Sequence, residues 1–152
     1  MSTIVGGIGI AHTPSMGREY DAGMARAFDP KWRPWYDGTR PVKAWLEEAA
    51  ATHLVVVYND HMNYFDLSTY PTFAIGMSAH FPQADEGYGK RPFPGVDGDP
   101  DFAWPVARKL IEIGFDLTFC QELELDHGIY SWLPYLFDAP WPLKCCPLRS
   151  TC

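Results

Sequence analysis

Residues 53–58 read HLVVVY and form the most continuous apolar run of the chain. A short run rich in β-branched residues is typical of a strand that is covered on both faces. The preceding residues, 41–51, begin with a proline that suits the first turn of a helix. Val42, Trp45 and Leu46 give this helix one apolar face. A helix leading into a covered strand is the repeating unit of an α/β domain.

The same alternation extends to both sides of this helix and strand. We expect further strands at residues 4–10 (IVGGIGI), 71–77 and 115–125, and helices at residues 20–28 and about 100–114. Asp99 or Asp101 is placed to cap the last helix. Loops are expected at residues 29–41 and 82–100, which are rich in proline or glycine. The sequence therefore predicts an α/β fold with a mixed or mostly parallel sheet flanked by helices.

Length and charge exclude several classes of protein. The chain has 152 residues and a formal charge of −7, which suits a single acidic domain. A nucleic acid or an anionic membrane would select a basic face, so we expect neither as a partner. No apolar run approaches the roughly 20 residues of a membrane-spanning helix, and the start of the chain lacks the basic region of a signal peptide. We therefore expect a cytoplasmic protein.

Three histidines share one kind of position. His12, His61 and His127 each follow one of the expected strands, as AHTP, YNDH and LDHG. In an open α/β sheet, ligands bind at the carboxyl ends of strands, so three imidazoles could converge on one crevice. The alternative is that each is a surface or capping residue. We expect that role for the remaining histidines, His53 and His80.

Two aspartates precede the second and third of these histidines. Asp60 and Asp126 point away from their histidine neighbours if the backbone is extended, because consecutive side chains then alternate. We expect them to orient the histidines rather than to bind a metal. Asp85 and Glu86 could belong to a charged loop of the site, but we expect a solvated turn. Two histidines and a carboxylate would suit non-haem Fe(II) and oxygen chemistry, whereas three histidines would suit hydrolytic zinc, so both remain open.

Five blocks of the chain resemble one enzyme family. In order, they are GGIGIAHTPSMG (6–17), VVVYNDHMNYFD (55–66), PTFAIG (71–76), ADEGYGKRPFP (84–94) and FDLTFCQELELDHG (115–128). Together they resemble the class III extradiol ring-cleavage dioxygenases, and are most similar to the β (catalytic) subunit of protocatechuate 4,5-dioxygenase. The gallate and 3-O-methylgallate dioxygenases are similar relatives. The chain then corresponds to the N-terminal part of that α/β fold.

The resemblance implies roles for individual residues. His12, in a block where alanine replaces the usual serine, and His61 would ligate Fe(II), with Asn59 close by. His127 would be a catalytic residue near the substrate. Such enzymes use Fe(II) and O₂ to cleave a catechol-type aromatic acid, such as protocatechuate or gallate, beside its diol. The resemblance also implies a small α subunit and a homo-oligomer as possible partners.

The resemblance ends near Lys144. The family's glutamate ligand and histidine base lie further along its chain and have no counterpart here; Glu124 does not fit the glutamate's motif. Residues 145–152 (CCPLRSTC) are a Cys-rich tail that fits neither a zinc motif nor a disulfide framework. We therefore expect a catalytic domain over residues 1–144, a truncation or frameshift after it, and little activity from this chain alone.

Two other functions compete with ring cleavage. A non-catalytic fragment or interaction subunit would have the same scaffold without a complete site, and its histidines would be structural. A zinc hydrolase or lyase would use His12, His61 and His127 together. Metal content distinguishes the three cases, because they require iron, no metal and zinc respectively.

Overall fold

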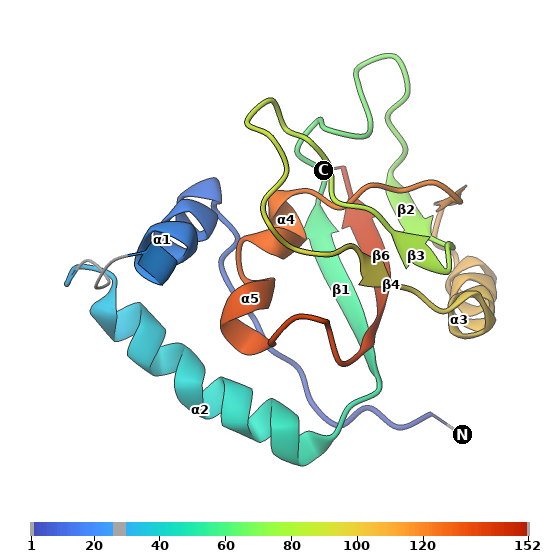
Figure 1. Cartoon of the computed structure of the whole chain (residues 1–152). Coiled ribbons are helices and arrows are strands. Elements are labelled where there is room, and N and C mark those ends of the chain that lie inside the picture. The colour runs from blue at the N-terminus through green and yellow to red at the C-terminus, as the bar shows by residue number, and fades with distance from the viewer. Residues whose placement is uncertain (1, 26–29, 152) are drawn as a thin grey trace.

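The computed structural model describes residues 2–25 and 30–151, and has helices on both sides of a mixed sheet (Figure 1). In chain order the elements are α1 (Pro14–Ala25), α2 (Arg33–Ala49), β1 (His53–Asn59), β2 (Phe73–Gly76), β3 (His80–Phe81), β4 (Val96–Asp97), α3 (Pro100–Glu112), β5 (Leu117–Cys120), α4 (His127–Tyr130), α5 (Leu133–Leu136) and β6 (Lys144–Ser150). Among the described residues, no helix is both long enough and apolar enough to span a bilayer.

The larger sheet has the strand order β1-β6-β2-β5. β1 is parallel to β6, and β2 is parallel to β5, but β2 and β6 are antiparallel. The two parallel pairs therefore run in opposite directions. A short antiparallel pair, β3 with β4, lies beside this sheet. The predicted α/β class with a mixed, mostly parallel sheet is confirmed.

Both faces of the central strands are buried. Neighbouring residues point to opposite faces, so Ala74 and Cys145 join one apolar cluster whereas Ile75 and Cys146 join another. The first cluster lies under α2, α4 and α5, and the second lies under α3. The predicted strands at residues 53–58, 71–77 and 115–125 correspond to β1, β2 and β5. Asp99 caps α3, as one of the two predicted candidates, because its side chain accepts hydrogen bonds from the backbone amides of Asp101 and Phe102.

The strand predicted at residues 4–10 is wrong. These residues are irregular, and Ile4 is 92% exposed. Glycines make poor strand residues because they offer no side chain to pack. Gly6 serves a close approach instead, because a Cβ there would collide with the ring of Trp45 in α2. The segment therefore crosses α2 without joining the sheet.

The first two helices begin earlier than predicted. α2 starts at Arg33, inside the predicted loop, because Pro34 fits a first turn and Asp37 pairs with Arg33 and Arg40. Pro41, the predicted start, lies within α2. The helix predicted at residues 20–28 is found as α1 at Pro14–Ala25, and residues 26–28 lie outside the described residues.

Residues 144–150 form a central strand. The sequence suggested a separate tail from residue 145, but β6 lies between β1 and β2. Cys145 and Cys146 are 4% and 2% exposed. A free cysteine behaves as a small apolar residue, so this pair suits a strand that is covered on both faces. Cys152 lies outside the described residues.

Candidate metal and substrate site

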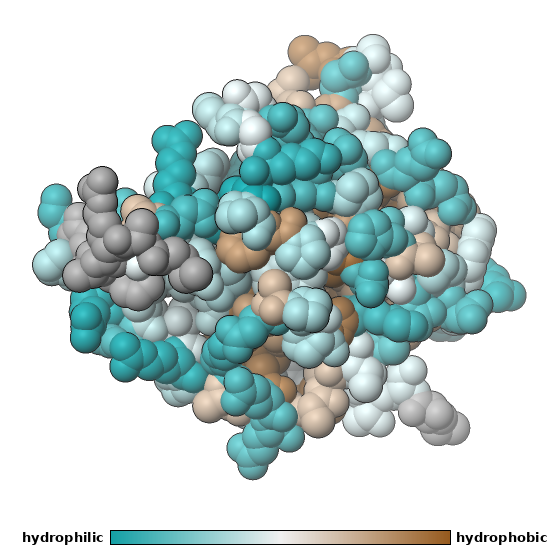
Figure 2. All heavy atoms as spheres, in the orientation of Figure 1, coloured by the Kyte–Doolittle hydropathy of each residue, from teal (hydrophilic) through white to brown (hydrophobic). Residues whose placement is uncertain are grey.

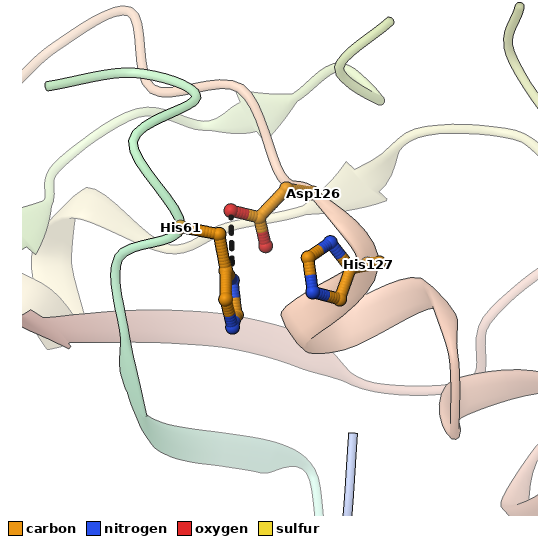
Figure 3. A group of neighbouring side chains, drawn as sticks. All are labelled: His61, Asp126 and His127. Atoms are coloured by element: carbon orange, nitrogen blue, oxygen red, sulfur yellow. Dashed lines mark hydrogen bonds and ion pairs between the residues drawn. The ribbon is translucent and has the colours of Figure 1, made fainter. Parts of the chain in front are cut away.

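The three predicted histidines come together. The ring centroids of His61 and His127 are 3.9 Å apart, and those of His12 and His61 are 5.1 Å apart. His12 precedes α1, His61 follows β1, and His127 is the first residue of α4. Figure 3 shows the rings of His61 and His127 side by side, with Asp126 close to His61. His53 and His80 lie elsewhere, each paired with an aspartate, Asp99 and Asp97 respectively.

The route to this convergence differs from the predicted one. His61 follows a strand as expected, but His12 follows none. β5 runs antiparallel to β1, because the two lie in parallel pairs of opposite direction. The end of β5 therefore lies at the other edge of the sheet, and residues 121–126 run back across the sheet to α4 (Figure 1). This return segment, which the sequence analysis did not foresee, brings His127 to His61.

Asp126 fixes the orientation of His61. Nδ1 of His61 donates to Oδ2 of Asp126 at 3.4 Å, and the backbone amide of Gly128 donates to Oδ1 at 2.8 Å. The other ring nitrogen of His61 lies on the side away from Asp126 (Figure 3). Burial would raise the pKa of Asp126, but the hydrogen bond from His61 and the charge of Arg149 outweigh it and lower that pKa. Asp126 is therefore an ionised acceptor that orients the imidazole.

Glu86 plays the same part for His127. Oε1 of Glu86 accepts from Nδ1 of His127 at 2.5 Å, and Oε2 accepts from its backbone amide at 2.8 Å. Burial would lower the pKa of His127, but the hydrogen bond and charge of Glu86 outweigh it and raise that pKa. The prediction of a solvated turn is wrong for Glu86. No local pattern marks this role, because the two residues are 41 positions apart.

His12 lies beside Asn59. Nε2 of His12 donates to Oδ1 of Asn59 at 3.1 Å. Burial, and then the neighbouring His61, lower the pKa of His12. A neutral imidazole is the form that binds a metal, so this environment favours a ligand role.

The donor set suits a transition metal. His61, Asp126 and His127 each offer one ligand atom, and these atoms lie within 4.8 Å of one another. Asp126 already accepts from His61 and lies 3.7 Å from Nη2 of Arg149, so direct metal binding would disturb both contacts. Among the described residues, no hydrogen bond engages Nε2 of His61, Nε2 of His127 or Nδ1 of His12. An imidazole-rich set with nearby carboxylates fits non-haem iron, and fits zinc as well.

A cavity of about 660 Å³ adjoins His61 and His127. Its walls come from α1, from the turn after β1, from residues 83–92 and from α4, and include His61, Glu86 and His127. This volume lies within the range of small-molecule sites. Hydrophilic residues cover much of the face shown in Figure 2. The long loop at residues 82–100 thus contributes a wall of the site, and its cavity-lining residues include Arg91, whose guanidinium is held by Asp21 at 2.7–2.8 Å.

A comparison with family models assigns the chain to a family. The model of the family described as the catalytic LigB subunit of aromatic ring-opening dioxygenase matches residues 6–152. The chain belongs to this family. The match includes β6 and runs past Lys144, where the sequence resemblance was expected to end.

Curated relatives agree with the LigB assignment. The chain is 30% identical to a 2,3-dihydroxyphenylpropionate/2,3-dihydroxicinnamic acid 1,2-dioxygenase of Rhodococcus sp. over 135 residues, which are 86% of this chain and 38% of the relative. It is 34% identical to a gallate dioxygenase of Pseudomonas putida over 68 residues, 43% of this chain and 20% of that protein. The LigB chain thus spans well under half the length of these relatives.

Proposed function

We propose that this LigB chain contributes the two-histidine part of an Fe(II) site for extradiol cleavage of a catechol-type aromatic acid. The observation that carries the proposal is the cluster of His12, His61 and His127 beside a cavity of about 660 Å³. Protocatechuate and gallate-like acids are the proposed substrates, and O₂ is the co-substrate. The gallate dioxygenase among the relatives supports this class of substrate. The dihydroxyphenylpropionate dioxygenases extend the class to aromatic acids with a longer substituent on the ring.

Each site residue has a proposed role that follows from its position. His12 and His61 would hold the Fe(II). Bound iron would supply open positions for the two catechol oxygens and O₂, so that both oxygen atoms enter the product. His127 faces the same cavity, and its Nε2 would hold a proton next to the substrate while Glu86 anchors its Nδ1. Asn59 and Asp126 accept from the rings of His12 and His61, and Asp60 accepts from the amide of Met62 in the turn that carries His61.

Turnover by residues 1–152 alone is proposed to be slow or absent. The sequence resemblance assigns a glutamate ligand and a histidine base to positions that have no counterpart among these residues. A small α subunit and further copies of the chain are the proposed partners, on the same resemblance. Binding and turnover should therefore be separable in this protein.

The proposal is tested by loading the chain anaerobically with Fe(II) and titrating it with protocatechuate, gallate and 2,3-dihydroxyphenylpropionate by calorimetry. We expect at least one acid to bind only when iron is present, and His61→Ala to abolish that binding. Binding that does not depend on iron, or the absence of binding by all three acids, would overturn the proposal. Oxygen uptake above about 1 s⁻¹, close to ordinary enzyme rates, would contradict the proposed low turnover.

An interaction subunit is the second candidate, because β1 presents apolar side chains to solvent. Val55 and Val57 are 47% and 69% exposed, and Ile4 is 92% exposed. Such a face favours association with another protein surface. In that case the purified chain would retain neither iron nor zinc, whereas retained zinc would support the hydrolase or lyase alternative.

A further inference from the structure

Arg149 lies buried beneath the histidine cluster. Arg149 is 0% exposed. It lies near the end of β6 and is paired with Tyr58 of β1 in the strand register. Nε donates to the hydroxyl of Tyr58 at 2.6 Å, Nη1 donates to Oδ1 of Asp60 at 2.7 Å, and Nη2 donates to the carbonyl of Glu124 at 2.5 Å. Nη2 also lies 3.7 Å from Oδ2 of Asp126. One cation thus lies between two buried carboxylates.

Each of these carboxylates belongs to a segment that carries a site histidine. Asp60 precedes His61, and its Oδ2 accepts from the amide of Met62 at 2.9 Å, which shapes the turn after β1. Met62 has a positive φ of 57°, so this turn needs such support. Asp126 precedes His127 and accepts from Nδ1 of His61. The guanidinium therefore joins the His61 segment to the His127 segment.

Burial makes this arrangement depend on the cation. Two carboxylates without solvent would repel each other and move apart, unless a nearby positive charge compensates. A displaced Asp126 would no longer accept from Nδ1 of His61. The planar guanidinium also has donors in fixed directions, so it can hold Tyr58, Asp60 and the Glu124 carbonyl at once. A lysine would keep the charge without this geometry.

We propose that Arg149 is a positioning residue for the histidine site: it holds Asp60 and Asp126 so that His61 presents Nε2 to the cavity side. It acts through Asp126 and Asp60 and does not itself touch a ligand. The consequence for metal binding rests on the proposed function, whereas the orientation of His61 does not. The segment CCPLRSTC, which the sequence set apart as a tail, thus supplies a supporting residue of the site.

The test compares Arg149→Lys with the wild-type chain in two measurements. The first is the tautomer of His61 in the metal-free protein at pH 8, from ¹⁵N NMR of the ring nitrogens. The second is the affinity for Co(II), used as an air-stable probe. We expect one Nδ1–H tautomer in the wild type, a mixture in Arg149→Lys, and a loss of Co(II) affinity of roughly 10- to 100-fold.

Two further variants keep the test decisive. Ile75→Val lowers packing in the cluster on the opposite sheet face, and should leave both measurements unchanged. Tyr58→Phe removes a single acceptor from Arg149 and decides the case if Arg149→Lys does not fold; we expect it to weaken Co(II) binding by roughly two- to tenfold. The proposal would be overturned if Arg149→Lys keeps the single His61 tautomer and binds Co(II) within twofold of the wild-type affinity. If Arg149→Lys does not fold, the same result in Tyr58→Phe would overturn it.

The failure of the proposed function would look different. A wild-type chain that binds no Co(II) would refute the metal site. In that case the His61 tautomer alone would still decide the role of Arg149, with a mixture in Arg149→Lys supporting it and a single tautomer overturning it.

Discussion

At the scale of single residues, the site depends on how carboxylates hold imidazole rings. His61 and His127 both donate through Nδ1 to a carboxylate, from Asp126 and Glu86 respectively. Such contacts fix the tautomer and direct Nε2 outward. The sequence revealed the histidines and the adjacent aspartates, because they follow expected strands. It could not reveal Glu86, because folding of the long loop brings it to His127.

Glu86→Gln should lower the pKa of His127. The charge and hydrogen bond of Glu86 raise this pKa, so removing the charge shifts it down. The linked stabilisation of the wild type is complete below about pH 6.5 and fades as the pH rises through the raised pKa. The Glu86→Gln variant should lack this pH-dependent stabilisation. NMR titration of the metal-free protein and urea unfolding at several pH values measure both effects.

The control for that experiment is Asp85→Asn. Asp85 lies next to Glu86, but its carboxylate accepts from the amides of Gly87 and Gly89 within its own loop. This variant should leave the His127 titration in place. An unchanged pKa in Glu86→Gln, or an equal shift in both variants, would contradict the assignment.

At the scale of elements, β6 is the feature that the sequence analysis misjudged. The sequence predicts a separate Cys-rich tail from residue 145, yet the thiols of Cys145 and Cys146 are buried and Arg149 is compensated by buried acceptors. The local sequence pattern does not distinguish a separate tail from a buried strand here, because the partners of Arg149 lie in other parts of the chain. α2 was misjudged for a related reason: prolines suggested a loop, although Pro34 suits the first turn and Pro41 is tolerated inside the helix.

The thiols of β6 should be unreactive in the folded protein. Burial raises the pKa of Cys146 to about 11, and burial also raises the pKa of Cys145 and of Cys120. In Cys152→Ser, a thiol-specific disulfide reagent at pH 8 should therefore label less than one thiol per chain rapidly, and three after unfolding in urea. Rapid labelling of Cys145 or Cys146 in the folded state would show that β6 is not a covered strand.

The cap of α3 predicts a second pH dependence. Hydrogen bonds from His53 and Lys144 to Asp99, at 3.1 and 2.9 Å, hold the pKa of Asp99 well below its usual range. A lowered carboxyl pKa stabilises the fold above the usual value near pH 4, and this stabilisation is lost as the pH falls through the lowered pKa.

Asp99→Asn should therefore flatten the acid limb of the stability curve. The measurement is the free energy of unfolding in urea between pH 2 and pH 7. Asp101→Asn, in the first turn of the same helix, is the matched control and should keep the slope of the wild type. Equal acid sensitivity in Asp99→Asn and wild type would show that Asp99 does not cause the loss of stability in acid.

At the scale of the whole molecule, the sheet is covered unevenly. α3 lies over the face of β2 and β5, whereas Val55 and Val57 of β1 remain exposed. The sequence predicted a strand covered on both faces here, because it contains an unbroken apolar run. Among the described residues, that cover is missing over part of β1. The class of fold was predictable from the alternation of elements, but strand order and direction depend on contacts that no local pattern records.

This uneven cover should cause association at high concentration. Val57→Thr keeps a β-branched side chain and removes apolar surface, so we expect it to reduce the weight-average mass seen by sedimentation between micromolar and millimolar concentrations. Leu67→Thr is the control, because Leu67 is 84% exposed but lies in the turn region after β1. Equal association of all three proteins would exclude the β1 face as its cause.

The most direct measurement is the stoichiometry and affinity of Fe(II) binding under anaerobic conditions, for the wild type, His12→Ala, His61→Ala and His80→Ala. We predict one saturable Fe(II) per wild-type chain, loss of that site in the His12 and His61 variants, and retention in the His80 variant, whose imidazole pairs with Asp97 away from the cluster. Iron retained in both the His12 and His61 variants, or no saturable site in the wild type, would contradict the account.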